Sequence, residues 1–430
     1  MNSVGERLRE ARLARGLTQG QLAQGLATKG FISQVERNRA IPSFAKLRLL
    51  AERLDLGLSE LTGDRPPVEL TYLRKSAELA VKAKEAERAI KLVDEAEPRA
   101  TTANDRADLM RIRGCALDEL GRLADALIAH QQAAAVAPPD DPELNASIYA
   151  EIGKVLAAQE RFNHAVEANL RAIHWLDRSK HADPALRARA YTNLGRALWS
   201  LGQVNEAHKY LMTALEAATD AESLFRIANA RMALGITARA KGKLDEAIEH
   251  CNRALELHAR IGQERTANRV LNNLGDVYYA MGRVADARDA QLRCLERARQ
   301  LKDAFEIGVA AAELARYTLE AGDARRALAL ARESQQAANR DGDHLHAAYA
   351  AAIEARAAEQ LGHPIVADRK FRAAIGMLLE RQAAGKLAEV CAMYAEVLRR
   401  RGQGDRAFAI MRVAAERDFS KLPTLIKARK

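Results

Sequence analysis

Small residues recur at a fixed spacing along most of this chain, and that repeat constrains the fold more than any other feature. A leading Gly or Ala is followed by Gly seven positions later, by Ala five positions after that, and by a further small residue after seven more. Copies begin forty residues apart, at Gly195, Gly235 and Gly275 and, in weaker form, at Ala315, Ala355 and Ala395. Because small side chains let two helices cross closely, the repeat predicts stacked helical hairpins.

This spacing resembles that of tetratricopeptide (TPR) repeats, in which each unit is a pair of antiparallel helices. The resemblance covers about residues 68–415, with earlier copies that begin at Gly153 and Gly114 and a degenerate one at Ala77. The period of forty exceeds the roughly 34 residues of the usual unit, so we expect longer helices or longer loops. We predict a right-handed α-solenoid of about nine hairpins over residues 70–417, and residues 418–430 as a cap or a tail.

Composition favours an all-α protein. Hydrophobic residues make up 48% of the chain and charged residues 29%, which is typical of a folded protein, and the 10 prolines and few β-branched runs disfavour a large sheet. The net charge of +10 permits an anionic partner but is spread along the chain. Four cysteines without a C-x-x-C pair favour a reducing, cytoplasmic setting, and we expect neither a signal peptide nor a membrane span.

The first sixty-two residues have a different pattern, that of several short helices. Thr18 and Thr28 stand where N-caps are expected, and Gly16 and Gly25 stand where turns are expected. We predict a bundle of five short helices over residues 1–62. A linker over residues 63–69, which contains Pro66 and Pro67, would separate this bundle from the repeats.

Three segments of the bundle, LTQGQLA, FISQVERN and PSFAKLRLLAERL, resemble the helix-turn-helix of the Cro and phage-repressor (XRE) family. The resemblance covers about residues 5–62 and implies that the helix from Thr28 enters the major groove of DNA. The segment between Leu22 and Ile32 is one residue shorter than is usual in the family. The resemblance assigns these residues to DNA: Thr18, Gln19, Thr28, Lys29, Gly30, Ser33, Gln34, Arg37, Asn38 and Arg39.

The chemistry of these side chains agrees with the assignment. Gln34 can pair bidentately with adenine, and Lys29 can donate to guanine. Gly30 would let the backbone approach closely, while Arg37 and Arg39 would contact phosphates and set the register. The other interpretation, a helix that only packs, leaves this polar face unexplained.

The first helix of each TPR hairpin predicts a second site. In such arrays these helices line a groove, and several polar or aromatic residues fall at groove-facing positions. They are Asn193, Arg196, Trp199, Asn229, Arg239, Asn272, Asn273, Asp276, Tyr279 and Arg316. Asn is disfavoured inside helices, but its amide both donates and accepts, which suits binding to the main chain of an extended peptide. The alternative is an ordinary solvated surface.

An XRE domain followed by TPR repeats resembles the peptide-responsive RRNPP regulators of Gram-positive bacteria. That resemblance implies quorum sensing, a homodimer, a palindromic operator and a short peptide effector. One alternative is a DNA-binding regulator whose repeats dock another protein without a small effector. A second is a phosphatase of response regulators, which the intact DNA-binding head disfavours. No nucleotide-binding, zinc-protease or hydrolase motif occurs, so we expect no enzyme activity, no cofactor and no metal.

Overall fold

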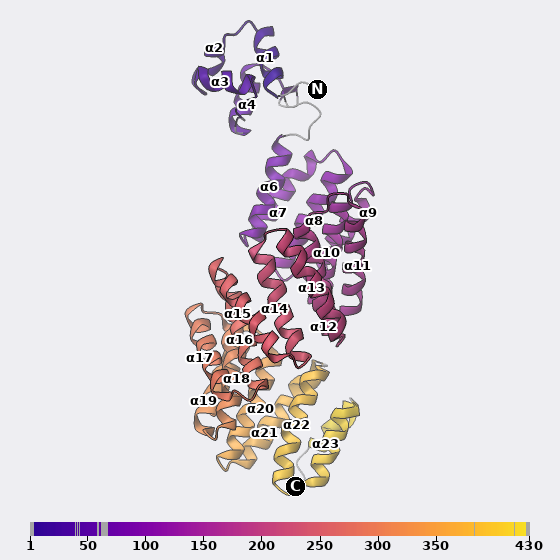
Figure 1. Cartoon of the computed structure of the whole chain (residues 1–430), viewed down its shortest axis with the longest axis vertical. Helices are drawn as coiled ribbons and strands as arrows, with labels where there is room; N and C mark the ends of the chain where they lie inside the picture. The colour runs from indigo at the N-terminus through magenta and orange to yellow at the C-terminus, as the bar shows by residue number, and fades with distance from the viewer. Residues whose placement is uncertain are drawn as a thin grey trace. The chain divides into compact units, whose positions relative to one another are not determined.

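The computed structural model describes residues 4–38, 40, 42, 44–57, 60–61, 68–381, 383–416 and 418–426. All regular secondary structure in these residues is helical, without any strand (Figure 1). The all-α prediction is therefore confirmed for the described residues. The chain divides into two compact units, Met1–Gln203 and Val204–Lys430, each described by itself below.

The N-terminal bundle, residues 4–61, is called the head. Its helices are α1 (Val4–Ala14), α2 (Gln19–Ala23), α3 (Lys29–Glu36) and α4 (Phe44–Arg53). Thr18 caps α2 in a capping box with Gln21, and Thr28 caps α3, as predicted. Apolar side chains from all four helices form one core, which includes Leu8, Leu22, Ile32, Val35 and Leu50. The predicted fifth helix begins at positions 58 and 59, which lie outside the described residues.

The predicted linker ends two residues earlier than expected. Helix α6 (Val68–Lys82) begins at Val68, so Val68 and Glu69 are helical, and residues 62–67 lie outside the described part of the chain. Pro66 and Pro67 come directly before this helix, and proline favours the start of a helix because its fixed φ suits the first turn.

Eighteen helices, α6 to α23, follow one another in the described residues. In the first unit they are α6 (Val68–Lys82), α7 (Ala86–Ala96), α8 (Ala103–Glu119), α9 (Leu123–Val136), α10 (Pro142–Ala158), α11 (Phe162–Arg178) and α12 (Pro184–Ser200), with a 3-10 turn η1 (Glu97–Arg99) after α7. In the second unit they are α13 (Val204–Asp220), α14 (Leu224–Ala240), α15 (Leu244–Arg260), α16 (Glu264–Ala280), α17 (Val284–Gln300), α18 (Ala304–Glu320), α19 (Ala324–Asp341), α20 (His344–Gln360), α21 (Pro364–Glu380), α22 (Ala384–Arg400) and α23 (Gly404–Glu416). Most are 17 residues long and are joined by three-residue turns, which accounts for the forty-residue period.

Glycines at the repeat positions do two separate jobs. Gly242, in the turn after α14, has φ +74°, a left-handed conformation that a side chain would strain. Gly235 lies where α14 crosses α15, and a Cβ there would be 2.6 Å from the sulfur of Cys251. The small-residue pattern of the sequence therefore records both turn geometry and close helix packing.

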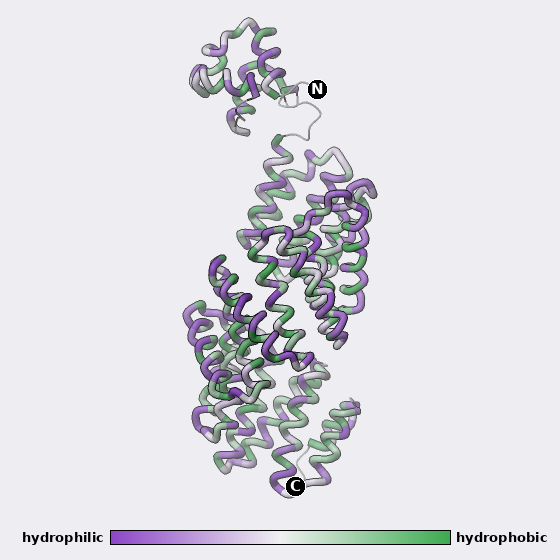
Figure 2. The backbone as a smooth tube through the Cα atoms, viewed as in Figure 1, coloured by the Kyte–Doolittle hydropathy of each residue, from purple (hydrophilic) through white to green (hydrophobic). Residues whose placement is uncertain are grey.

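The even-numbered helices from α6 to α22 are called A helices and the odd-numbered ones B helices. Within each unit, neighbouring A helices contact one another, as α8 does α10 and α20 does α22, in addition to their B partners. The A helices of a unit thus share one surface, called here its inner face. Polar and apolar residues alternate along the helices (Figure 2), as expected where one side of a helix is packed and the other is wet.

The C-terminal segment forms a cap on the last hairpin. A 3-10 turn η2 (Phe419–Lys421) leads into α24 (Leu422–Ile426), and the side chains of Leu422 and Ile426 are buried. Arg406 of α23 donates from Nε to the carbonyl oxygen of Leu425 at 3.1 Å. Of the two alternatives predicted for residues 418–430, the described part, up to residue 426, is therefore a cap.

Candidate functional site

Helix α3 presents a polar face to solvent. Thr28, Lys29, Gly30, Gln34 and Arg37 are exposed. Ser33 is half-buried, and the apolar side chains of Ile32 and Val35 are in the core. The helix is thus mounted by its apolar side and offers the opposite side to a partner. This is the arrangement expected of a recognition helix.

A buried ion pair fixes the orientation of α3. Glu36, in its last turn, accepts from Nε of Arg12 at 2.6 Å and from Nη2 of Arg12 at 3.0 Å, and both side chains are buried. Gln19 of α2 donates its amide to the same carboxylate at 2.7 Å. One carboxylate therefore ties α1, α2 and α3 together, and the amide nitrogen of Gln19 is engaged inside the head.

The ionisation of Glu36 follows from these contacts. Burial opposes the charged form, but the hydrogen bonds from Arg12 and Gln19 outweigh burial and lower the pKa of the carboxyl group. Arg12 also donates to the carbonyl oxygen of Leu17 at 2.7 Å, just before the cap of α2. The ion pair is therefore hydrogen-bonded on several sides, as a buried pair must be to be tolerated.

Glycines in the head differ in what surrounds them. A Cβ on Gly5 would lie 2.1 Å from the carbonyl oxygen of Val35, so Gly5 is required for α1 to pack against the end of α3. A Cβ on Gly30 would have no atom closer than 3.9 Å, and Gly20 at the same place in α2 is equally open. Internal packing therefore explains why position 5 is glycine. It does not explain Gly20 or Gly30, where alanine would fit and would stabilise the helix relative to glycine.

The remaining DNA-contact candidates lie at the start of α2 and directly after the end of α3. Thr18 is exposed, and Asn38 follows α3 with φ +58°, a conformation that Asn tolerates better than most residues. Arg39 lies outside the described residues. Arg53 of α4 donates to the carbonyl oxygen of Leu22 at 3.3 Å and also to that of Gln24, which holds the shortened turn between α2 and α3.

Four of the predicted groove residues lie together on the inner face of the second unit. Arg239 of α14 pairs with Asp276 of α16, with Nη1 3.1 Å from Oδ2. Tyr317 of α18 donates its hydroxyl to the other oxygen of Asp276 at 3.4 Å. Burial and the nearby Glu313 raise the pKa of Asp276 in spite of Arg239.

Tyr279 and Arg316 complete this cluster. The rings of Tyr279 and Tyr317 stack with centroids 4.7 Å apart, and the guanidinium of Arg316 lies 4.3 and 4.4 Å from the two centroids. Tyr279 donates to Glu320 at 2.7 Å, and Arg316 donates to Glu313 at 2.6 Å. Glu313 and Glu320 were missed, although they stand three residues before and four after Arg316, a spacing that predicts helical ion pairs.

Asn272 lies one turn before this cluster on α16. It is half-buried, and its Oδ1 accepts from Nε2 of the fully buried Gln291 of α17 at 2.9 Å. Asn273 and Asn229 are also half-buried. The sequence did not single out Gln291, because nothing in its own helix marks it as polar support for a residue nineteen positions earlier.

The other predicted groove residues belong to the first unit, on α12. Asn193 is half-buried and donates its amide to the carbonyl oxygen of Ala150 on α10 at 3.3 Å. Arg196 is exposed, and Trp199 is 41% exposed. The predicted set is thus divided between the two units, and only the second unit brings four of its members into one network.

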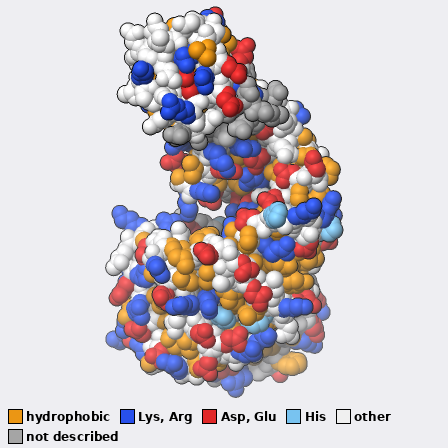
Figure 3. Space-filling view, turned by 45° about the horizontal axis from the view of Figure 1, so that its top comes forward, with side chains coloured by type: hydrophobic (Ala, Val, Ile, Leu, Met, Phe, Trp, Pro, Cys, Tyr) orange, Lys and Arg blue, Asp and Glu red, His pale blue; other side chains and the backbone are white. Residues whose placement is uncertain are grey.

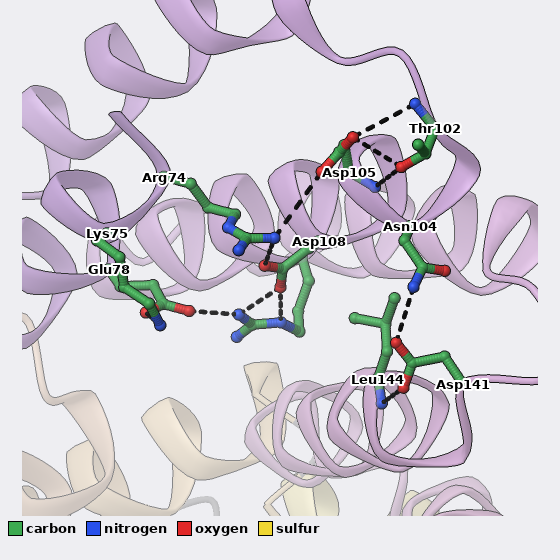
Figure 4. Close-up of polar contacts among 10 residues, drawn as sticks. Arg74, Lys75, Glu78, Thr102, Asn104, Asp105, Asp108, Asp141 and Leu144 are labelled. Atoms are coloured by element: carbon green, nitrogen blue, oxygen red, sulfur yellow. Dashed lines mark hydrogen bonds and ion pairs between the residues drawn. The ribbon is translucent and has the colours of Figure 1, made fainter. Parts of the chain in front are cut away.

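Charged pairs join each neighbouring pair of A helices in the first unit. Arg74 of α6 reaches Asp105 and Asp108 of α8, at 3.9 and 3.5 Å (Figure 4). Lys154 of α10 lies 2.6 Å from Asp118 of α8. Arg189 of α12 pairs with Glu151 of α10. This ionic ladder was not predicted from the sequence, since it depends on how successive hairpins are staggered.

Burial and neighbouring charges shift the pKa values of side chains around this ionic ladder. Burial opposes ionisation of Glu151, but the charges of Arg189 and Lys154 lower its pKa to about 2. Burial, with the negative charge of Glu151, raises the pKa of the Cys115 thiol to about 12. Cys115 is partly buried, and burial raises the pKa of each of the other three free cysteines to about 12 as well. These thiols are therefore protonated at neutral pH and are weak nucleophiles.

Over the face of the molecule in Figure 3, basic and acidic side chains are interspersed on the second unit.

No group of three or more His, Cys, Asp or Glu side chains in the described residues could hold a metal ion. No described helix is long and apolar enough to span a membrane.

The sequence matches two kinds of known family. Residues 8–61 match a helix-turn-helix family, and residues 188–220 and 226–300 match tetratricopeptide-repeat families. No curated protein matches the chain. The helix-turn-helix and repeat predictions are thereby confirmed.

Solved structures share the fold of most of the chain. A Rap protein complexed with competence and sporulation factor matches with a TM-score of 0.63 and 15% identity, over 83% of this chain and 98% of that one. The apo form of the quorum sensor NprR from B. thuringiensis matches with a TM-score of 0.62 and 14% identity, over 81% and 98%. The Rap conjugation gene regulator of plasmid pLS20 in complex with the Phr* peptide matches with a TM-score of 0.54 and 13% identity, over 84% and 98%.

At these identities the similarity establishes the fold and leaves function to the sites. The head supplies a helix with an exposed polar face, α3, and the repeats supply two inner faces rich in polar side chains. The chain is therefore a DNA-binding regulator of the helix-turn-helix type with an array of tetratricopeptide repeats, and its fold is that of the Rap proteins and NprR.

Proposed function

We propose that this protein is a cytoplasmic transcriptional regulator that reads a specific DNA sequence with α3. The observation that carries this proposal is the exposed polar face of α3, held in place by the buried pair of Arg12 and Glu36. The first backbone N–H groups of a helix have no partner within it, and α3 begins in solvent at Thr28. These groups suit a phosphate or a base edge.

Each predicted DNA-contact residue has a role in this proposal. Gln34, in the middle of α3, would read a base pair, and Lys29 would donate to guanine. Gly30 would let DNA approach the backbone. Arg37, Asn38 and Arg39 would contact phosphates, together with Thr18 and Thr28. Ser33 is half-buried and would contact only a DNA atom that comes close to the surface of α3. Gln19 would contact DNA with a side-chain amide whose nitrogen already donates to Glu36.

The regulator would act as a homodimer on a palindromic operator. Two heads related by two-fold symmetry read half-sites about 34 Å apart, which is one turn of DNA. Dimerisation would involve the repeats, whose surface is far larger than that of the head. Analytical ultracentrifugation together with footprinting of selected DNA tests both points, because a monomer or an asymmetric footprint contradicts them.

The repeats would bind an effector, and we propose a short signalling peptide. The half-buried Asn272 and Asn273 and the nearby cluster of Tyr279 and Arg316 offer hydrogen-bond and aromatic contacts on one inner face. A quorum sensor and a Rap protein in complex with a peptide have this fold. Binding would change the DNA affinity only through a difference in peptide affinity between two arrangements of the chain.

A second candidate is a regulator whose repeats dock another protein without a small effector. One observation favours it: Arg239, Asp276 and Arg316 already satisfy one another or their neighbours. We propose no enzymatic role for either candidate. Operator affinity in the presence and absence of peptides from the growth medium of the native host separates the two, since only the first candidate predicts a change.

A further inference from the structure

The inner face of the second unit contains one side-chain amide whose orientation is set from inside the protein. Gln291 lies on α17 at the position that faces the crossing with α16. A Cβ on Gly275 would lie 2.9 Å from its Nε2, so the glycine makes room for this side chain. In the preceding and following hairpins the same position is filled by Cys251 and Ala331, both fully buried. A glutamine here is therefore not a requirement of the repeat.

Gln291 makes two contacts with one residue. Its Nε2 lies 3.3 Å from the backbone carbonyl oxygen of Asn272 and 2.9 Å from the side-chain Oδ1 of Asn272. A backbone carbonyl can only accept, so the nitrogen and not the oxygen of Gln291 must face it. The oxygen atom of Gln291, by contrast, is buried without a hydrogen-bond partner.

This contact fixes the amide of Asn272 in turn. With the nitrogen of Gln291 facing it, Asn272 must turn its Oδ1 inward, because the other orientation would oppose two donors. The Nδ2 group of Asn272 then points away from Gln291, and Asn272 is half-buried on the inner face. Leaving the oxygen of Gln291 unpaired costs free energy that an apolar residue at this position would avoid.

We propose that Gln291 is a positioning residue that presents the Nδ2 group of Asn272 as a donor, so that the effector offers a hydrogen-bond acceptor, a peptide carbonyl, at this point. This inference rests on the proposed effector site. A donor held in one orientation before binding improves affinity because less conformational freedom is lost. A peptide that offered an N–H group at the same place would be rejected, since it would oppose donor with donor.

The orientation is tested first without any peptide, on the full chain labelled with ¹⁵N. Loss of signals in Gln291→Met assigns the Nε2 protons of Gln291, and their exchange with solvent is then followed. Asn272→Asp keeps an acceptor for Gln291, so we expect its Nε2 protons to stay protected within about threefold of the unmutated chain. Asn272→Leu removes the side-chain acceptor and leaves only the backbone carbonyl oxygen at 3.3 Å, so exchange should be at least tenfold faster. Equal loss of protection in Asn272→Asp and Asn272→Leu overturns the assigned orientation.

The role in binding is tested with randomised pentapeptides, from which a binder is selected on the unmutated chain. Gln291→Met should leave the helical content and melting temperature of the chain unchanged but lower its affinity for the selected peptide about tenfold. Cys251→Ala is the control, because it changes the equivalent position of the preceding hairpin without touching Asn272 and adds no volume at the close crossing with Gly235. Adding Gln291→Met to Asn272→Ala should have no further effect, since the two act as a unit.

The outcomes separate this inference from the proposed function. Unchanged affinity in Gln291→Met, or equal loss in Cys251→Ala, overturns the positioning role. A chain that selects no pentapeptide contradicts the peptide effector and with it the carbonyl assignment. Protected Gln291 protons in Asn272→Asp support the donor orientation in either case, and unprotected ones refute it.

Discussion

The carboxylate of Glu36, in the last turn of α3, receives two hydrogen bonds from Arg12 of α1, at 2.6 and 3.0 Å. The two residues are 24 positions apart, and both side chains are almost fully shielded from water. This pair orients α3 on the rest of the head.

Replacing Arg12 should loosen the head. Arg12→Met leaves the carboxylate of Glu36 buried without its cation, a change that typically costs about 3–5 kcal/mol. Hydrogen exchange of the amides in α1 and α3 measures this loss of stability locally. Tryptophan fluorescence would not report on the head, because the two tryptophans of the sequence, Trp175 and Trp199, lie in the repeats. Arg15→Met is the control, because the pair of Arg15 with Asp55 is exposed and should contribute less than ~1 kcal/mol. Equal effects of the two changes contradict the account.

Acid should weaken the head through Glu36. Its pKa in the folded head lies below the usual value of 4.5 because hydrogen bonds from Arg12 and Gln19 outweigh burial. A depressed carboxyl pKa stabilises the fold fully above the unfolded pKa, and this stabilisation is lost as the pH falls through the folded pKa. Exchange of the α3 amides, corrected for intrinsic rates, should therefore speed up below about pH 4.5. Glu36→Gln should remove most of this dependence, and an unchanged dependence would argue against Glu36 as its source.

Gly30→Ala should separate stability from DNA binding. Space around Gly30 is open, and Ala favours a helix over Gly by up to about 1 kcal/mol, so the head should be as stable as before or slightly more so. If DNA approaches the backbone at Gly30, the added methyl group should lower affinity about tenfold or more. Gly5→Ala is the contrasting variant, because its Cβ would clash with the carbonyl oxygen of Val35 and unfold the head. Undiminished DNA affinity in Gly30→Ala would remove the close approach from the proposal.

Arg37→Ala and Gln34→Ala should fail in different ways. Arg37 is exposed at the end of α3, and loss of one phosphate contact should weaken all DNA sequences alike and reduce the salt slope by roughly 0.9. Gln34 is exposed in the middle of α3, and its loss should relax the preference at one base pair by about 1–3 kcal/mol. Titrations of the selected operator and a scrambled one, at several salt concentrations, distinguish the two patterns. A common pattern for both variants would show that their roles were wrongly divided.

Local signals in the sequence predicted much of this fold. Thr18 and Thr28 cap the helices they were expected to cap, because a cap depends on only three or four neighbouring residues. The forty-residue period likewise predicted the hairpins, and its excess over the usual repeat is explained by 17-residue helices. These features could be predicted because short segments of chain determine them.

Contacts between distant segments could not be predicted in the same way. The pairs Arg12–Glu36 and Glu151–Arg189 join residues 24 and 38 positions apart, and the stagger of the helices decides whether they meet. Groove residues were therefore placed on the correct helices, but their partners, such as Glu320 and Gln291, were missed. The assignment of individual residues to contacts with DNA and with an effector stays a prediction.

Sequence-specific reading of DNA by α3 is the central part of the proposed function. The direct measurement is to select DNA from a random pool with the full chain and then compare its affinity for the selected site and for a scrambled duplex at the same physiological salt concentration. We expect the two affinities to differ by about a thousandfold or more, and Gln34→Ala to reduce this ratio while the head stays folded. Equal affinity for both duplexes, or a ratio unaffected by Gln34→Ala and by Lys29→Ala, would contradict sequence-specific reading by α3.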